Sequence, residues 1–128
     1  MSESDLYPAI IGALSNGPTR LLRINAGFAW QGTVAERTPR RLVLLDPRPV
    51  KLGVPGVSDL IGWSTVDLPG ELSVAVFTAI EVKFGRGKLT PEQSAFLHTV
   101  NRMGGRAGVA RSVEDARAII EGDNADPS

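Results

Sequence analysis

One stretch of the sequence, VAVFTAIEVK at residues 74–83, limits the choice of folds more than any other. It is apolar at both even and odd positions until its last residues, where Glu81 and Lys83 introduce charge. Such a pattern is typical of a strand in the centre of a sheet that is covered on both faces. We therefore predict a buried central strand that carries two charges to the edge of a sheet.

The residues after this strand predict a helix and then another strand. Thr90 has the features of an N-cap, Pro91 suits the first helical position, and Gln93 completes a capping box. The helix is expected to end at Gly104-Gly105, before a short strand at 107–111, and its apolar stripe is expected to be Phe96, Val100 and Met103. Strand, helix and strand in this order predict a parallel crossover.

The rest of the chain predicts a helix near each end and more strands. Residues 3–15 carry an apolar stripe at helical spacing, and Ser112 is expected to cap a last helix. Strands are expected at 20–25, 32–36, 41–45 and 59–63, with a proline-rich loop at 47–58. The order helix, three or four strands, helix, strand, helix predicts an α/β fold with a mixed central sheet flanked by helices. We expect one domain over residues 1–121 and a flexible tail at 122–128.

Composition removes several classes of protein and site. The chain has no cysteine, and His98 is its only histidine, so thiolate chemistry and multi-histidine metal sites are excluded. No apolar run reaches membrane-spanning length, and the first residues lack the features of a signal peptide, so a cytoplasmic protein is expected.

Charge is balanced overall, with 14 basic and 14 acidic residues, but it is arranged in blocks. Residues 17–56 hold seven basic residues against two acidic ones, and residues 83–111 hold six against one. Between them, residues 57–82 hold four acidic residues and no basic one. Such blocks either place basic walls around an acidic centre, which suits a metal ion held against a polyanion, or form ordinary solvated faces.

Three charged residues form the candidate constellation. Glu81 and Lys83 are two apart on a strand and so point to the same face, while Asp59 opens the neighbouring short strand. Two carboxylates that face each other repel unless a cation lies between them, and Mg²⁺ or Mn²⁺ prefers such oxygen ligands. The alternatives are a structural ion pair between Glu81 and Lys83 and a turn capped by Asp59.

Four motifs in order resemble the VRR-NUC group, the small phage-type members of the PD-(D/E)XK nuclease superfamily. These motifs are GVPGVSDL at 53–60, AIEVK at 79–83, GKLTPEQ at 87–93 and NRMGGRAGVARSVEDA at 101–116. The resemblance also covers the N-terminal helix and RLLRINAGFAW at 20–30, and it implies a restriction-endonuclease-like fold. One departure is that the usual Pro-Asp of the family is Ser58-Asp59 here.

The resemblance implies a role for each matching residue. Asp59 and Glu81 would bind Mg²⁺ or Mn²⁺ together with the backbone carbonyl of Val82, and Lys83 would be the catalytic lysine. Gln93 matches the glutamine at the head of the following helix, although a purely structural capping role suits it equally well. The family places one more acidic ligand in the N-terminal helix, where Glu3 matches best and Asp5 is the alternative.

The resemblance also implies an activity. We expect a metal-dependent endodeoxyribonuclease that acts as a homodimer on branched DNA such as four-way junctions, in the cytoplasm of a bacterium or of a phage host. The alternative is a non-catalytic nucleic-acid-binding or assembly module on the same fold. His98 has no assigned role, and Trp30 and Trp63 are expected in the core rather than stacked on bases. The candidate DNA contacts are Arg20, Arg23, Lys51, Arg86 and Lys88.

Overall fold

A computed structural model describes residues 2–24 and 27–122 of the chain. They form two compact units, one built from residues before 25 and after 54, and the other from residues 25–54. The predicted tail lies outside the described residues except for Gly122. No helix within the described part of the chain is long and apolar enough to cross a membrane.

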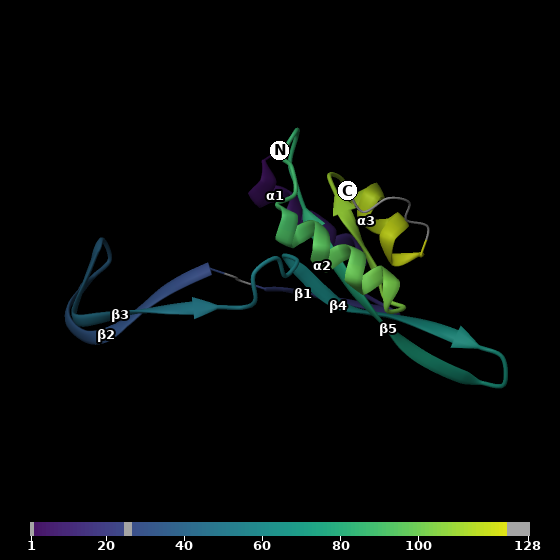
Figure 1. The fold of residues 1–128 in the computed structure, drawn as a ribbon, viewed down its shortest axis with the longest axis horizontal. Coiled ribbons are helices and arrows are strands. Elements are labelled where there is room, and N and C mark those ends of the chain that lie inside the picture. Colours follow the sequence, from purple (N-terminus) through teal and green to yellow (C-terminus); the bar gives the residue numbers. More distant parts are fainter. Residues whose placement is uncertain (1, 25–26, 123–128) are drawn as a thin grey trace. The chain divides into compact units, whose positions relative to one another are not determined.

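The larger unit is a four-stranded mixed sheet with three helices (Figure 1). The strand order is β1-β4-β5-β6, in which β5 and β6 are parallel and the other neighbours are antiparallel. The strands are β1 (Thr19–Arg23), β4 (Leu60–Leu68), β5 (Leu72–Val82) and β6 (Arg106–Ala110). The helices are α1 (Glu3–Leu14), α2 (Pro91–Arg102) and α3 (Val113–Ile120). The predicted mixed sheet flanked by helices, with a parallel β5-α2-β6 unit, is confirmed.

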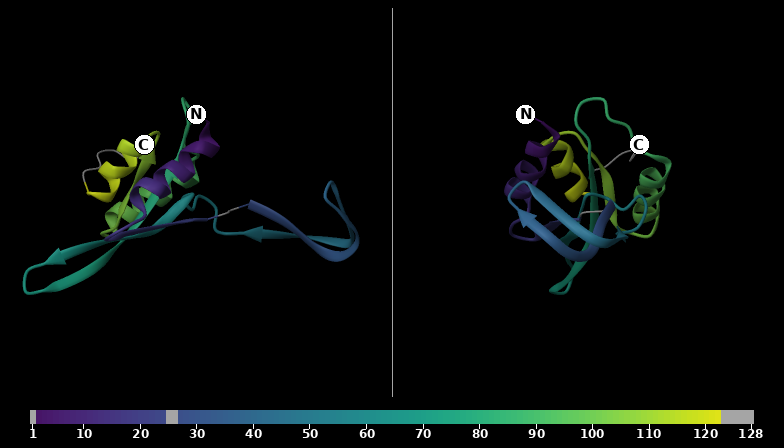
Figure 2. Two further views of the ribbon diagram at one scale, coloured as in Figure 1. Left: turned by 180° about the vertical axis from the view of Figure 1, so that it is seen from behind. Right: turned by 90° about the vertical axis from the view of Figure 1, so that its left-hand side faces the viewer.

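The helices cover the two faces of this sheet unequally. Leu6 and Ile10 of α1 and Ile119 of α3 pack against Leu60 and Ile80 on one face. On the other face, Leu97 of α2 packs against Ala79 and Ala107. The right-hand view of Figure 2 shows the sheet between α2 on one side and α1 with α3 on the other.

Local signals explain where α2 begins. The Thr90 hydroxyl accepts a hydrogen bond from the Gln93 N–H at 3.1 Å, and Gln93 Oε1 accepts one from the Thr90 N–H at 2.9 Å, so the predicted capping box is confirmed. The predicted stripe is wrong for Met103, which is 79% exposed because it is the C-cap residue beyond the last turn. Leu97 is the buried residue of this helix.

Strand β5 departs from the prediction over its first half. Its buried residues begin at Thr78, whereas Val74 and Phe77 are 37% and 44% exposed. The reason is that β4 and β5 run on beyond the helices as a two-stranded ribbon, which Figure 1 shows. Trp63, on β4 between Arg20 of β1 and Phe77 of β5, is 42% exposed, so its expected place in the core is wrong.

The smaller unit is a hairpin of β2 (Gly27–Thr38) and β3 (Arg41–Leu52). Its strands form a separate two-stranded sheet and do not pair with β1, β4, β5 or β6. The loop expected at 47–58 is also wrong up to residue 52, where β3 continues. A two-stranded hairpin accepts Pro47 and Pro49 because each strand has an open edge that needs no N–H donor. Trp30 of this hairpin is 63% exposed and not in a core.

Candidate active site

Asp59 and Glu81 meet because of the antiparallel register of β4 and β5. Leu60 pairs with Ile80, so the next step outward along both strands sets Asp59 opposite Glu81. The Asp59 N–H donates a hydrogen bond to Oε2 of Glu81, and the Val82 N–H donates one to Oδ2 of Asp59, both at 3.3 Å. Two carboxylates separated by 22 positions in the sequence are thus neighbours at one edge of the sheet.

The loop that leads to Asp59 is held against the first turn of α2. Gly56 has a φ of +84°, and a Cβ there would collide with the Glu92 carbonyl oxygen, so only glycine fits this close approach. The next polar residue, Ser58, is 1% exposed, and its hydroxyl has no hydrogen-bond partner in the described part of the chain. The Ser58-Asp59 departure from the family pattern therefore places an unpaired hydroxyl beside the site.

Glu81 is almost completely enclosed and is held by two side chains besides its contact with Asp59. It is 2% exposed, and its Oε1 accepts a hydrogen bond from Nε2 of Gln93 at 2.9 Å. The Lys83 Nζ lies 3.8 Å from the same oxygen, as expected for residues two apart on one face of a strand. Gln93 therefore caps α2 with its oxygen and holds Glu81 with its nitrogen, so the structural and site-related interpretations of this residue both apply.

The electrostatics of the pair favour a bound proton or a cation. Burial raises the pKa of Glu81 to about 8, and the hydrogen bond to Asp59 and the charge of Asp59 add to this, while Lys83 acts in the opposite direction. A carboxyl with so high a pKa is poorly tolerated as an anion at this place. Facing carboxylates with a nearby backbone carbonyl form an oxygen-rich donor set, which fits a hard divalent cation such as Mg²⁺ or Mn²⁺.

Tyr7 of α1 belongs to the site, although sequence reasoning did not single it out. Burial, followed by a hydrogen bond to Asp59 and by the charges of Asp59, Glu3 and Glu81, raises the pKa of its phenol. The Arg23 guanidinium carbon lies 4.1 Å from the centre of the Tyr7 ring, a cation–π contact that holds a positive charge close to the carboxylates. The available signal was spacing, because Tyr7 shares the helical stripe of Ile10 and Leu14.

The acidic residues at the start of α1 behave differently from each other. Asp5 caps the helix, since its Oδ2 accepts hydrogen bonds from the Ser2 N–H at 2.8 Å and the Ser2 hydroxyl at 2.9 Å, and these bonds lower its pKa. Glu3 is exposed, and its charge is felt at Tyr7. Among residues 2–24 and 27–122, no three acidic or histidine side chains are placed to hold one metal ion, so the structure does not bring Glu3 to Asp59 and Glu81.

The expected DNA-contacting residues are all exposed, but they do not form one group. Arg20 donates hydrogen bonds to the carbonyls of Gly17 and Thr19, at 3.0 and 2.8 Å. Arg86 and Lys88 lie in the loop that follows β5, directly after Lys83. Lys51 lies on β3 in the smaller unit.

Arg111 is a basic residue of the larger unit that the sequence did not single out. It donates a hydrogen bond to the carbonyl of Gly85 at 2.9 Å and so fastens the loop between β5 and α2. Together with Lys88 it lines a hollow beside the first turn of α2. No motif marks this role, because it depends on β6 lying next to β5.

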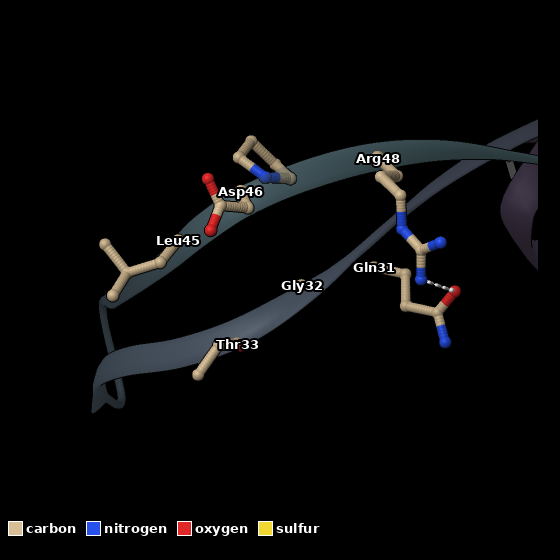
Figure 3. Close-up of a pocket in the computed structure, with 7 residues that line it drawn as sticks. Gln31, Gly32, Thr33, Leu45, Asp46 and Arg48 are labelled. Atoms are coloured by element: carbon tan, nitrogen blue, oxygen red, sulfur yellow. Dashed lines mark hydrogen bonds between the residues drawn. The ribbon is translucent and has the colours of Figure 1, made fainter.

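The hairpin carries a separate hollow that lacks the groups for catalysis (Figure 3). It lies where the β2–β3 register shifts near Gly32, and its lining residues are Gln31, Gly32, Thr33, Leu45, Asp46, Pro47 and Arg48. Arg48 donates to Gln31 at 3.4 Å, and Asp46 is the only carboxylate in the lining. The edge of the larger sheet therefore remains the candidate active site.

A mixed sheet flanked by helices, with Asp on one strand and Glu-x-Lys on its neighbour, is the arrangement of a PD-(D/E)XK-type nuclease domain. The sequence matches the VRR-NUC domain over residues 20–114, and the chain belongs to this family of nucleases. No curated protein and no solved structure matches the chain. The family makes DNA the substrate, and nuclease domains of this type generally use divalent metal ions.

Proposed function

We propose that the chain is a divalent-metal-dependent endodeoxyribonuclease whose active site is the sheet edge at Asp59, Glu81 and Lys83. The observation that carries this proposal is the pairing of the two carboxylates across β4 and β5, with Nζ of Lys83 at 3.8 Å from Glu81. A structural ion pair needs only Glu81 and Lys83. The second carboxylate adds a repulsion that costs stability unless a cation balances it.

The residues that would hold a Mg²⁺ or Mn²⁺ ion are Asp59, Glu81 and the carbonyl of Val82. That carbonyl points to the same edge of β5 as the Val82 N–H, which contacts Asp59. When bound, the ion would supply Lewis acidity toward a phosphate oxygen and a water molecule that is acidic enough to attack. Glu3 is not grouped with the two carboxylates in the described part of the chain, and its place as a further ligand stays a prediction.

The chain's own side chains complete the chemistry. Lys83 is 18% exposed, so its ammonium group is partly desolvated and can still donate to a phosphate oxygen as negative charge develops there. Gln93 orients Glu81 through Oε1, and Tyr7 orients Asp59 through its hydroxyl. Arg23, held over Tyr7, adds a positive charge next to the position that the phosphate would take.

Contacts with DNA would come from exposed basic residues of both units. Arg20 and Arg23 lie on β1, Arg86 and Lys88 follow β5, and Lys51 lies on the hairpin. We further propose branched DNA such as a four-way junction as the substrate and a homodimer as the active form, in the cytoplasm of a bacterium or phage host. One site per chain makes a single cut, and two matched cuts on a junction require a symmetric pair.

The test is a cleavage assay with labelled linear, flap, splayed and four-way DNA, in Mg²⁺, Mn²⁺ or chelator. We expect metal-dependent cleavage that is strongest on the four-way substrate and lost in Asp59→Asn and Glu81→Gln, with DNA binding retained. Lys83→Ala should lower the rate by about 100-fold or more while metal binding persists. Glu114→Gln, on the exposed face of α3, is the matched control and should cleave normally. DNA binding without cleavage under every condition would support the non-catalytic module instead.

A further inference from the structure

The outer half of the β4–β5 ribbon carries an apolar face without cover. Residues 60–64 of β4 and 78–82 of β5 lie under or near helices, whereas the strands beyond them run on as two strands alone (Figure 1). A two-stranded ribbon is at best marginally stable in water by itself. Its side chains therefore indicate what it packs against.

The register sorts these side chains onto two faces. Val66 pairs with Val74 and Leu68 with Leu72, and cross-strand partners lie on the same face of a sheet. Alternation continues this face inward to Leu60, in the core under α1 and α3. We call its outer part the aliphatic ribbon face, which consists of Val66, Leu68, Leu72, Val74 and Val76.

The opposite face of the ribbon is mostly polar toward the tip. There it carries Thr65, Asp67, Ser73 and Ala75, and the Ser73 hydroxyl donates a hydrogen bond to Asp67 at 2.6 Å. Nearer the helices, this face carries the pair Trp63 and Phe77, which are 42% and 44% exposed. On the aliphatic ribbon face, Leu68 is 40% and Leu72 is 56% exposed. A contiguous and exposed apolar patch of this kind marks an interface rather than a solvated surface.

We propose that the aliphatic ribbon face is the dimer interface, on which a second copy of this chain packs its own aliphatic ribbon face across a twofold axis near Val66 and Val74. This inference rests on the homodimer of the proposed function and names the surface that forms it. A twofold interface requires a self-complementary patch, and an uncharged aliphatic face meets that requirement.

Charge at the two ends of the ribbon supports the same pairing. The turn at the tip of the ribbon carries Glu71 and no basic residue, whereas Asp67 lies on the opposite face. The base of the aliphatic face carries Arg106, in register with Thr78, and the Arg106 guanidinium also donates to the Ile120 carbonyl. Gly70 at the tip and Thr78 at the base are each four residues from Val74. A twofold axis at Val74 therefore brings each acidic tip over the Arg106 row of the other copy. An apolar face with an acidic tip does not suit DNA, which attracts basic surfaces.

The mass of the chain in solution, measured by sedimentation without DNA, tests this interface. We expect the wild-type chain to be a dimer, and Val74→Lys to weaken dimerisation by about 100-fold or more, because the twofold places two lysines in each interface. Thr65→Lys, on the polar face of the same ribbon, is the matched control and should remain a dimer. Both positions are exposed, so circular dichroism should show the same fold for both variants. A monomeric wild-type chain, or a Val74→Lys variant that dimerises normally, would overturn the proposal.

A crosslinking experiment locates the axis independently. The chain has no cysteine, so a single introduced cysteine is the only thiol. Val74→Cys should give a covalent dimer with a short bis-maleimide, whereas Thr65→Cys should remain monomeric after denaturation; the reverse pattern would contradict the proposed face. Cleavage of a linear duplex by Val74→Lys with Mg²⁺ separates the two proposals. If the variant loses the dimer and still cleaves the linear duplex, the result supports the interface and a nuclease with one complete site per chain, and leaves the dimer necessary only for paired cuts on a junction. A wild-type dimer that never cleaves refutes only the proposed function.

Discussion

Replacing Glu81 with glutamine should stabilise the metal-free protein above neutral pH although it removes cleavage. Glutamine has the shape of glutamate, and its Oε1 can still accept the hydrogen bond from Gln93. Its amide nitrogen takes the place of Oε2, so the hydrogen bond from the Asp59 N–H is lost, but the amide can donate to the Asp59 carboxylate, which a glutamate anion repels. The substitution therefore removes a charge that the fold accommodates poorly and that a metal ion requires.

The magnitude follows from the pKa of Glu81. This pKa rises from its ordinary value of 4.5 to about 8, so the folded state binds a proton more tightly than the unfolded chain. The contribution of Glu81 to the free energy of unfolding is therefore fully present below pH 4.5 and is lost as the pH rises through about 8. At about 1.4 kcal/mol per pKa unit, the loss is of order 4 to 5 kcal/mol when Glu81 is ionised. Glu81→Gln should recover part of that amount, because it removes the charge but also the acceptor of the Asp59 N–H.

Denaturant unfolding in chelator between pH 4.5 and 9 measures the effect. The wild-type free energy of unfolding should fall across this range, while that of Glu81→Gln should change much less and exceed the wild-type value at pH 9. Mg²⁺ at pH 8 should stabilise the wild-type chain and leave Glu81→Gln nearly unaffected. Glu114→Gln serves as the control for removing one acidic charge. A wild-type stability that rises between pH 5 and 8 in chelator, or a Glu81→Gln variant that is weaker at pH 9, would refute this reasoning.

Three further predictions concern the neighbours of the pair. Ser58→Ala should raise the free energy of unfolding by about 1 kcal/mol in denaturant unfolding, because it removes a buried unpaired hydroxyl. A lower free energy of unfolding would show that this hydroxyl has a partner. Gln93→Glu should keep the helix cap but lose the hydrogen-bond donor to Glu81. Cleavage should therefore fall, while the helix content measured by circular dichroism should not change. Full cleavage would show that Gln93 only caps the helix. Tyr7→Phe should weaken Mg²⁺ binding by roughly 10-fold in calorimetry, because the hydrogen bond that orients Asp59 is lost; unchanged affinity would exclude that role.

The sequence alone determined the features that depend on a few adjacent residues. The Thr90 capping box and the alternation that sets Glu81 and Lys83 on one side are local, because they follow from hydrogen bonds or side-chain directions within four positions. The βαβ order around α2 and the VRR-NUC motifs could likewise be predicted. These features were sufficient to predict a mixed sheet and a nuclease family.

The tertiary structure decided which distant residues meet. Asp59 lies opposite Glu81 because of one particular register, and a slip by a single residue would turn Asp59 to the other face. Tyr7 reaches Asp59 from a helix packed on the sheet, and its place in an apolar stripe showed only that it is buried. The apolar residues of β5 were predicted to be covered along the whole strand, yet the helices cover only its second half. An apolar pattern indicates that a face of a strand avoids water. Which element packs on that face depends on the length and position of every other helix and strand, and of any second chain.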